Sequence, residues 1–216
     1  MNVLLHILNA SGALDLVAKL IEDECAKSLK KIADKLPISG VDVVVYDNPQ
    51  RVIPEVGIGG YSPSAHLVFI SLDAKSSTLT KIIREQFKRT LAHELHHCIR
   101  WRNPGYGKTL LEALVSEGLA DHFDLEVNGT SPQPWCTALR KEDIVMFSKR
   151  AEREYTAKDY NHRAWFFGSN IKEIPRWAGY ALGYDLVKKY LVQHPDESPA
   201  SLVNMSAGKL QKELKP

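Results

Sequence analysis

The sequence has little cysteine, almost no net charge and no long apolar run. Its three cysteines, Cys25, Cys98 and Cys136, are an odd number without the paired spacing of a disulfide framework, which favours a reduced, cytoplasmic setting. The formal charge of +2 arises from 28 basic and 26 acidic residues that are interspersed, so we expect neither a nucleic acid nor a membrane as partner. No segment approaches the roughly 18 apolar residues that a membrane span requires.

The chain also lacks internal repeats, low-complexity stretches and any linker that would divide it. With 216 residues, 44% hydrophobic and 25% charged, it has the composition of a soluble globular protein with one core. The N-terminal apolar stretch lacks the basic residues of a secretion signal and is interrupted by His6, so we expect a first strand there. The sequence therefore predicts a single domain over residues 1–216, with lobes of about 1–80 and 81–216.

What the chain does contain is the pentapeptide HELHH at residues 93–97, which matches the H-E-x-x-H pattern of zinc hydrolases. Residues four apart lie on the same face of a helix, so His93 and His97 can reach one metal ion. Glu94 lies about 100° around the helix from His93, where its carboxylate can take a proton from a metal-bound water. The motif predicts two ligands for one zinc ion and a general base.

The sequence around the pentapeptide supports a helix. Between Thr80 and Trp101, apolar residues recur at spacings of three and four with no Gly or Pro among them. Asn103, Pro104 and Gly105 then follow, and these residue types end helices. A second amphipathic helix is predicted to begin near Thr109.

The second helix carries the candidate for a third ligand. Catalytic zinc sites keep three protein ligands and leave a further position to water, and Glu117 follows His97 at a distance that lets an antiparallel helix return past the metal. Asp121, one turn further, is expected to accept the second ring N–H of a ligating histidine. Glu112 is the less favoured ligand, because it points about 140° away from Glu117. His96 is expected in the core or at the surface.

HELHH together with SEGLADHF at residues 116–123 resembles the H-E-x-x-H and E-x-x-x-D signature of the gluzincin metallopeptidases. More narrowly, GIGGY at 57–61, WFFG at 165–168 and PRWAGYALGYDLV at 175–187 resemble a family of small predicted Zn-dependent proteases catalogued as a domain of unknown function. The resemblance covers about residues 41–193. The metzincin extension is not matched, since Arg100 and Asn103 stand where it requires Gly and His.

The resemblance implies a zincin-like α+β fold. Its N-terminal α/β lobe would have a small mixed sheet, its C-terminal lobe would be mainly helical, and the zinc site would lie on two antiparallel helices between them. His93, His97 and Glu117 would bind one Zn²⁺ per chain, and Glu94 would be the general base. Related enzymes stabilise the oxyanion with a Tyr or His from the C-terminal half, for which Tyr180 is the first candidate and His162 the second.

The function expected is a zinc metallopeptidase that acts on a peptide or protein. Two alternatives stay open: a zinc hydrolase of another amide or ester, and a non-catalytic zinc-binding regulatory protein on the same scaffold. Zincin folds bind an extended peptide along an edge strand, and Gly57–Tyr61 is the candidate for that strand, although a plain turn fits these residues equally well. The oligomeric state is left open.

Hydrophobic periodicity and turn residues predict the remaining elements. They are a helix at Leu14–Leu36, strands at Val41–Tyr46 and Ala65–Leu72, a charged helix at 139–155, an irregular aromatic stretch at 156–169, a last helix at Pro175–Gln193 that has its proline in the first turn, and a solvated tail at Lys209–Pro216.

Overall fold

The computed structural model describes residues 2–213. The chain forms two compact units: the first is Met1–Arg102 with Val127–Gly129, and the second is Asn103–Glu126 with Thr130–Pro216. Along residues 2–213, no helix combines the length and the apolar character that crossing a membrane requires.

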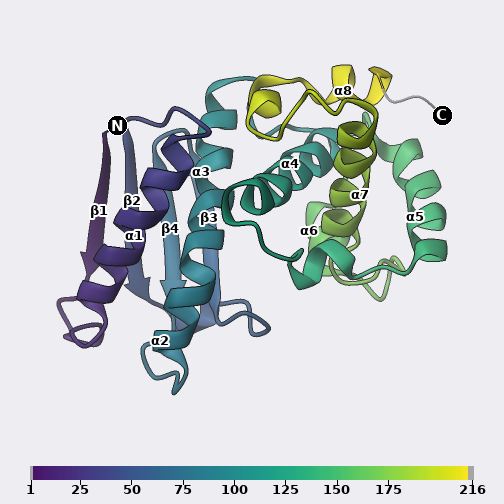
Figure 1. Ribbon diagram of the computed structural model, residues 1–216. Coiled ribbons are helices and arrows are strands. Elements are labelled where there is room, and N and C mark those ends of the chain that lie inside the picture. Colours follow the sequence, from purple (N-terminus) through teal and green to yellow (C-terminus); the bar gives the residue numbers. More distant parts are fainter. Residues whose placement is uncertain (1, 214–216) are drawn as a thin grey trace. The chain divides into compact units, whose positions relative to one another are not determined.

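The first unit contains a four-stranded mixed sheet, drawn in purple and blue in Figure 1. Its strands are β1 (Val3–Leu8), β2 (Val41–Asp47), β3 (Ile58–Ser64) and β4 (Leu67–Leu72). In the order β1-β2-β4-β3, the first three strands run parallel, and β3 pairs antiparallel with β4 at the edge. This small mixed sheet confirms the α+β class, and β1 confirms the first strand.

Helices cover one face of this sheet. They are α1 (Ala18–Ala33), α2 (Leu79–Ile82), the π-helical turn η2 (Ile83–Phe87) and α3 (Lys88–Arg102), and a 3₁₀ turn η1 lies at Pro49–Arg51. Both α1 and α3 lie against the sheet in Figure 1, and α3 contacts β3 and β4. Alternate residues of β2, Val41, Val43 and Val45, are at most 2% exposed beneath them, which is the period-two pattern of a strand with one buried face.

The helix expected at Leu14–Leu36 is shorter than its hydrophobic pattern suggests. It begins at Ala18 because the preceding residues form turns, in which the side-chain oxygen of Asn9 accepts a hydrogen bond of 2.8 Å from the Leu14 amide. Leu16, which shares the periodicity, lies in these turns and is fully exposed. The helix expected at Thr80–Trp101 is confirmed, with one departure: η2 interrupts its regular hydrogen bonding, as π-turns often do in helices that carry functional residues.

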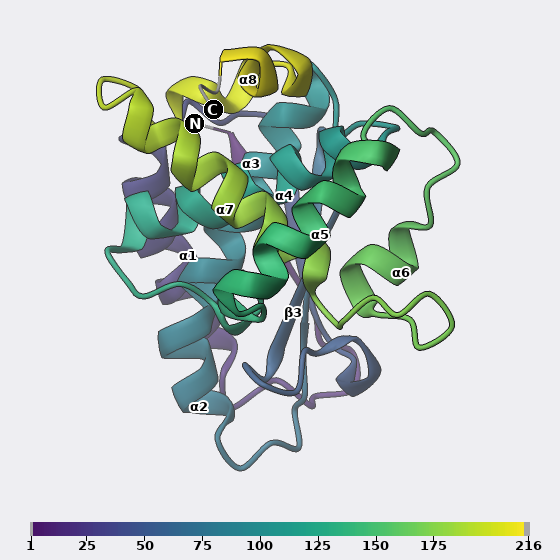
Figure 2. The ribbon, with the colours of Figure 1, turned by 90° about the vertical axis from the view of Figure 1, so that its right-hand side faces the viewer.

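The second unit is helical. It contains α4 (Leu110–Asn128), the 3₁₀ turn η3 (Pro134–Thr137), α5 (Lys141–Glu154), α6 (His162–Phe167), α7 (Ala178–Gln193), the 3₁₀ turn η4 (Ser201–Asn204) and α8 (Ala207–Glu213). Figure 2 shows α5 beside α7, and α7 contacts α5, α6 and η3. Two apolar clusters flank α4, one formed with α5, α6 and α7, the other with α7, η4 and α8.

The structure departs from three expectations for this unit. The aromatic stretch at 156–169 contains a helix, α6, which the Asn161 side chain caps through a 2.9 Å hydrogen bond from the Ala164 amide. The last helix, expected from about Pro175 to Gln193, is confirmed over Ala178–Gln193 but begins later than expected, because Trp177 takes a left-handed conformation with φ 66°. The tail from Lys209 lies partly in α8, where Leu210 is fully buried, while its last residues, 214–216, lie outside the described residues.

Two glycines allow α4 and α7 to approach each other closely. A Cβ at Gly118 would overlap the Gly183 carbonyl group, and a Cβ at Gly183 would overlap the Leu114 carbonyl oxygen. Side chains at either position would therefore push the helices apart. The close crossing fixes the part of α4 that carries Glu117.

Candidate metal centre

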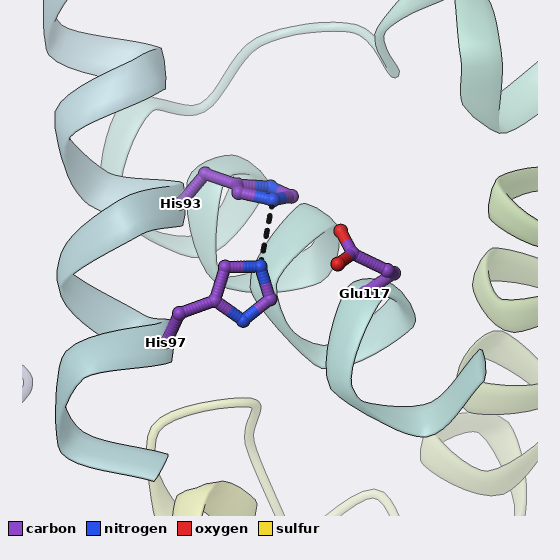
Figure 3. Close-up of side chains that lie close together, drawn as sticks. All are labelled: His93, His97 and Glu117. Carbon is purple, nitrogen blue, oxygen red and sulfur yellow. Dashed lines mark hydrogen bonds between the residues drawn. The ribbon is translucent and has the colours of Figure 1, made fainter. Parts of the chain in front are cut away.

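His93 and His97 lie one turn apart on α3 and face each other. Their Nε2 atoms are 3.0 Å apart, and the rings meet edge to face at a centroid distance of 4.7 Å (Figure 3). His97 is 6% exposed and His93 is half-buried. The two ring nitrogens are thus close enough to approach one ion from the same side of α3.

Glu94 is buried beside the edge strand β3. Its Oε2 atom is 2.7 Å from the Ser62 hydroxyl oxygen, which also lies 2.8 Å from the Glu94 carbonyl oxygen. The carbonyl oxygen of Ser62 accepts a hydrogen bond of 2.9 Å from the Trp101 indole N–H. Ser62 therefore joins β3 to α3 with both its side chain and its main chain, and restrains the Glu94 carboxylate.

Gly60 makes this approach of strand and helix sterically feasible. A Cβ built at Gly60 would lie 2.7 Å from both Glu94 Cγ and Thr90 Cγ2, well inside van der Waals contact. Gly60 and the neighbouring Tyr61 are both exposed, Tyr61 to 64%. Residues 58–61 of the GIGGY segment thus lie in the edge strand β3, whereas Gly57 lies in the preceding turn, and Gly60 lies directly against Glu94.

Glu117 is buried in the middle of α4 and is hydrogen-bonded by a tyrosine. The Tyr106 hydroxyl donates to Glu117 Oε1 over 2.6 Å. Burial, followed by the negative charge of Glu117, holds the pKa of Tyr106 well above its usual 10, so the phenol keeps its proton and remains a donor. Glu117 is 6% exposed, so its charge is stabilised by such contacts rather than by bulk water.

His93, His97 and Glu117 form a group that could hold a metal ion. Each offers one ligand atom, and these atoms all lie within 4.8 Å of one another (Figure 3). Two imidazole nitrogens and one carboxylate oxygen are the donor set of catalytic zinc sites that have three protein ligands. The side chains present therefore fit a zinc ion by their chemistry and by their spacing.

Tyr180 and His162 lie in the second unit among other aromatic side chains. The Tyr180 ring packs edge-on against Phe166 at a centroid distance of 5.0 Å. His162 stacks on Phe166 at 4.4 Å, and its Nδ1 atom is 3.0 Å from the Tyr160 hydroxyl oxygen. Burial lowers the pKa of His162, against the opposing effect of the Glu117 carboxylate, which favours a neutral imidazole near pH 7.

The structure describes the surroundings of three further residues: Glu112 and His96, which are not favoured as ligands, and Asp121, the predicted partner of a ligating histidine. Glu112 caps the N-terminus of α4, because its Oε2 atom accepts hydrogen bonds from the Lys108 and Thr109 amides at 2.7 and 2.9 Å. His96 is fully buried in α3, which agrees with the expected core position and not with the surface position. Asp121 is 3% exposed, and its Oδ1 atom accepts a hydrogen bond of 2.9 Å from the Trp135 indole N–H.

The sequence did not single out Ser62 or Tyr106. Ser62 could have been found from strand periodicity, since it follows Gly60 by two residues and so faces the same side of β3. Tyr106 lies in the loop between α3 and α4, where no periodic signal exists, and only the folded loop brings its hydroxyl to Glu117.

This arrangement of a zinc-compatible ligand group and a neighbouring buried glutamate agrees with the comparison of the chain with known proteins. A family model described as "Predicted Zn-dependent protease (DUF2268)" matches residues 19–212. The chain belongs to this family.

Two relatives come from Bacillus subtilis (strain 168). The uncharacterized protein YjfC is 25% identical over 160 residues, which cover 68% of this chain and 52% of YjfC. The uncharacterized protein YjaZ is 31% identical over 108 residues, which cover 47% of this chain and 41% of YjaZ. The matches thus span about half of each relative or less. No solved structure matches the chain.

Proposed function

We propose that the chain is a zinc-dependent metallopeptidase of the gluzincin type, with one catalytic domain on a zincin-like scaffold. The observation that carries the proposal is the group of His93, His97 and Glu117, which has a buried glutamate, Glu94, beside its first histidine. Membership of a family described as predicted Zn-dependent proteases supports the same function.

In this proposal His93, His97 and Glu117 hold one zinc ion per chain. Zinc bound to two histidines and a carboxylate makes water acidic enough to lose a proton near neutral pH and polarises a carbonyl group. To bind the ion, both imidazoles must be unprotonated at Nε2 and the Glu117 carboxylate must be ionised. The hydrogen bond from Tyr106 to Glu117 supports the ionised form.

Glu94 is the proposed general base. Its carboxylate takes a proton from the attacking water and then gives that proton to the amine that leaves when the peptide bond breaks. The hydrogen bond from Ser62 to Oε2 restrains the carboxylate, and Oε1 is the proposed proton acceptor. Burial of Glu94 limits competing contacts with solvent.

The proposed substrate is an extended peptide or protein segment that binds along β3. An edge strand can pair its main-chain groups with those of a substrate, which gives affinity without dependence on substrate sequence. The residues proposed for this role are Gly57–Tyr61, and Gly60 lets the strand, and so a paired peptide, lie close to Glu94.

Tyr180 is the first candidate for donating a hydrogen bond to the oxyanion, and His162 is the second. If the Tyr160 hydroxyl donates to His162 Nδ1, the proton of the neutral ring is on Nε2, which is then the donor. Matched Tyr180→Phe and His162→Gln variants separate the two, because only loss of the true donor lowers kcat by about 100-fold or more while zinc stays bound.

The two alternatives differ from the peptidase proposal in distinct ways. A hydrolase of another amide or ester would use the same zinc ligands and the same base, and differs in substrate. A zinc-binding protein without activity has no use for a base, so Glu94 favours the enzyme. Digestion of an unbiased peptide library, run beside a panel of small esters and amides, separates the three.

The ligand set is tested by zinc binding to Glu117→Gln and Glu112→Gln. Both substitutions remove one carboxylate charge from α4 and keep a hydrogen-bond acceptor. We expect Glu117→Gln to lose most of the zinc affinity, and Glu112→Gln, which keeps its cap on α4, to bind about one zinc per chain with wild-type affinity. Equal zinc affinity in the two variants would contradict the assignment of Glu117.

A further inference from the structure

Tyr106 is attached to two consecutive residues of α4. Its hydroxyl donates to Glu117 Oε1 over 2.6 Å, and its carbonyl oxygen accepts a hydrogen bond of 2.6 Å from the Ser116 hydroxyl. Both ends of the residue are therefore fixed on the helix turn that carries Glu117. A tyrosine held at two points loses little further freedom when its hydroxyl binds a carboxylate.

The chain that follows Tyr106 is fixed as well. Glu112 accepts hydrogen bonds from the Lys108 and Thr109 amides and from the Thr109 hydroxyl, at 2.7, 2.9 and 3.0 Å. Gly107 has φ 115°, and a Cβ there would overlap the Glu112 side chain. The first two turns of α4 thus hold the loop at residues 106–109 in one conformation, so Tyr106 is in position before any metal binds.

The Tyr106 ring is also packed from the side. It lies edge-on to the His162 ring at a centroid distance of 6.4 Å, and it joins the apolar cluster around Trp165 and Phe166. Packing against His162 and the two hydrogen bonds to α4 restrict the ring to one direction. The hydroxyl is consequently held at Glu117 by the fold.

We propose that Tyr106 is a positioning residue for Glu117, which fixes the carboxylate so that one oxygen is favoured as the metal ligand. A carboxylate can rotate and can offer either oxygen, or both, to a metal. A hydrogen bond to Oε1 restrains that rotation and sets the plane of the group before the metal binds. This inference rests on the proposed role of Glu117 as a zinc ligand.

The test compares the zinc dissociation constants of Tyr106→Phe and Tyr155→Phe, measured by chelator competition. Tyr155 is a matched control, because it is a partly buried tyrosine that packs against the same apolar cluster as Tyr106 and takes no part in the proposed site. We expect Tyr106→Phe to bind zinc about 10- to 100-fold more weakly than wild type, and Tyr155→Phe to bind it with wild-type affinity. The absorption spectrum of the cobalt-substituted protein should change in Tyr106→Phe alone.

Glu117→Gln, measured alongside, separates failure of this inference from failure of the proposed function. If Glu117→Gln loses zinc while Tyr106→Phe binds it as tightly as Tyr155→Phe does, the positioning role is wrong and the ligand role stands. If Glu117→Gln binds zinc like wild type, both are wrong. Should Tyr106→Phe not fold, Ser116→Ala takes its place: weaker zinc binding than in Tyr155→Phe supports the inference, and equal binding overturns it.

Discussion

The Ser62 hydroxyl on β3 lies 2.7 Å from Oε2 of Glu94 on α3, so the proposed substrate-binding strand also holds the proposed base. A shift of β3 would move Glu94 with it. If a peptide binds along β3 as proposed, its position and that of the Glu94 carboxylate are coupled through Ser62.

Ser62→Ala should lower kcat by about 10- to 100-fold, because a hydrogen bond to a charged group contributes about 1.5–3 kcal/mol. KM and zinc content should stay near their wild-type values, since neither the strand's main chain nor the ligands change. Ser64→Ala, on the same strand, is the control. Steady-state kinetics with a cleaved library peptide give the comparison, and equal kcat values for the two variants would remove Ser62 from the account.

Gly60→Ala should disturb both stability and activity. The added methyl group would meet Glu94 and Thr90, and such overpacking typically costs about 1–3 kcal/mol. Urea unfolding measures the loss, and kcat should fall in parallel because Glu94 is displaced. Gly208→Ala on α8 has open space around it, and should stabilise the protein by up to about 1 kcal/mol. A Gly60→Ala variant as stable and active as wild type would show that β3 does not approach α3 this closely.

His122 should make stability depend on pH. Burial lowers its pKa below the usual 6.5; its ring stacks on Tyr184 at 4.2 Å and its Nε2–H donates to the Tyr184 carbonyl oxygen over 3.0 Å. As the pH falls below about 6.5, the unfolded chain binds a proton before the folded chain does, so the free energy of unfolding decreases. Above that pH this contribution is fully present.

In His122→Asn, the free energy of unfolding should decrease less as the pH falls, because protonation of His122 no longer contributes. Urea unfolding of the metal-free protein between pH 8 and pH 5 provides the measurement. The variant should be less stable than wild type at pH 8, because it lacks the ring stacking, and should lose less stability on acidification. If the free energies of unfolding of both proteins decreased equally with falling pH, the prediction would be wrong.

Regular elements with a clear hydrophobic period were predicted well. Each of these patterns arises because one face of the element is buried, so it can be predicted from the sequence alone. Examples are the alternation of Val41, Val43 and Val45 and the helical spacing around HELHH. The same holds for the spacing of His93 and His97. Their geometry depends on one turn of one helix, and it requires no knowledge of the rest of the chain.

Contacts that depend on loops and local backbone strain were not predictable in this way. Trp177 takes a left-handed conformation, and the Arg176 guanidinium lies 3.9 Å from the centre of its ring. No pattern in the sequence indicates that α7 begins only at Ala178. Tyr106 reaches Glu117 because of how the loop before α4 folds. Leu210 lies in a charged tail of the sequence, yet in the structure it packs into a buried apolar cluster.

Glu94 is proposed to be the base of a zinc peptidase, and the variant Glu94→Gln tests this role. The amide keeps the size of the side chain and can still contact Ser62, but it cannot take a proton from water. Zinc content and cleavage of a peptide library should be measured on the same samples of wild type and variant. We expect about one zinc per chain in both proteins and cleavage by wild type only; equal cleavage by Glu94→Gln would show that Glu94 is not the base.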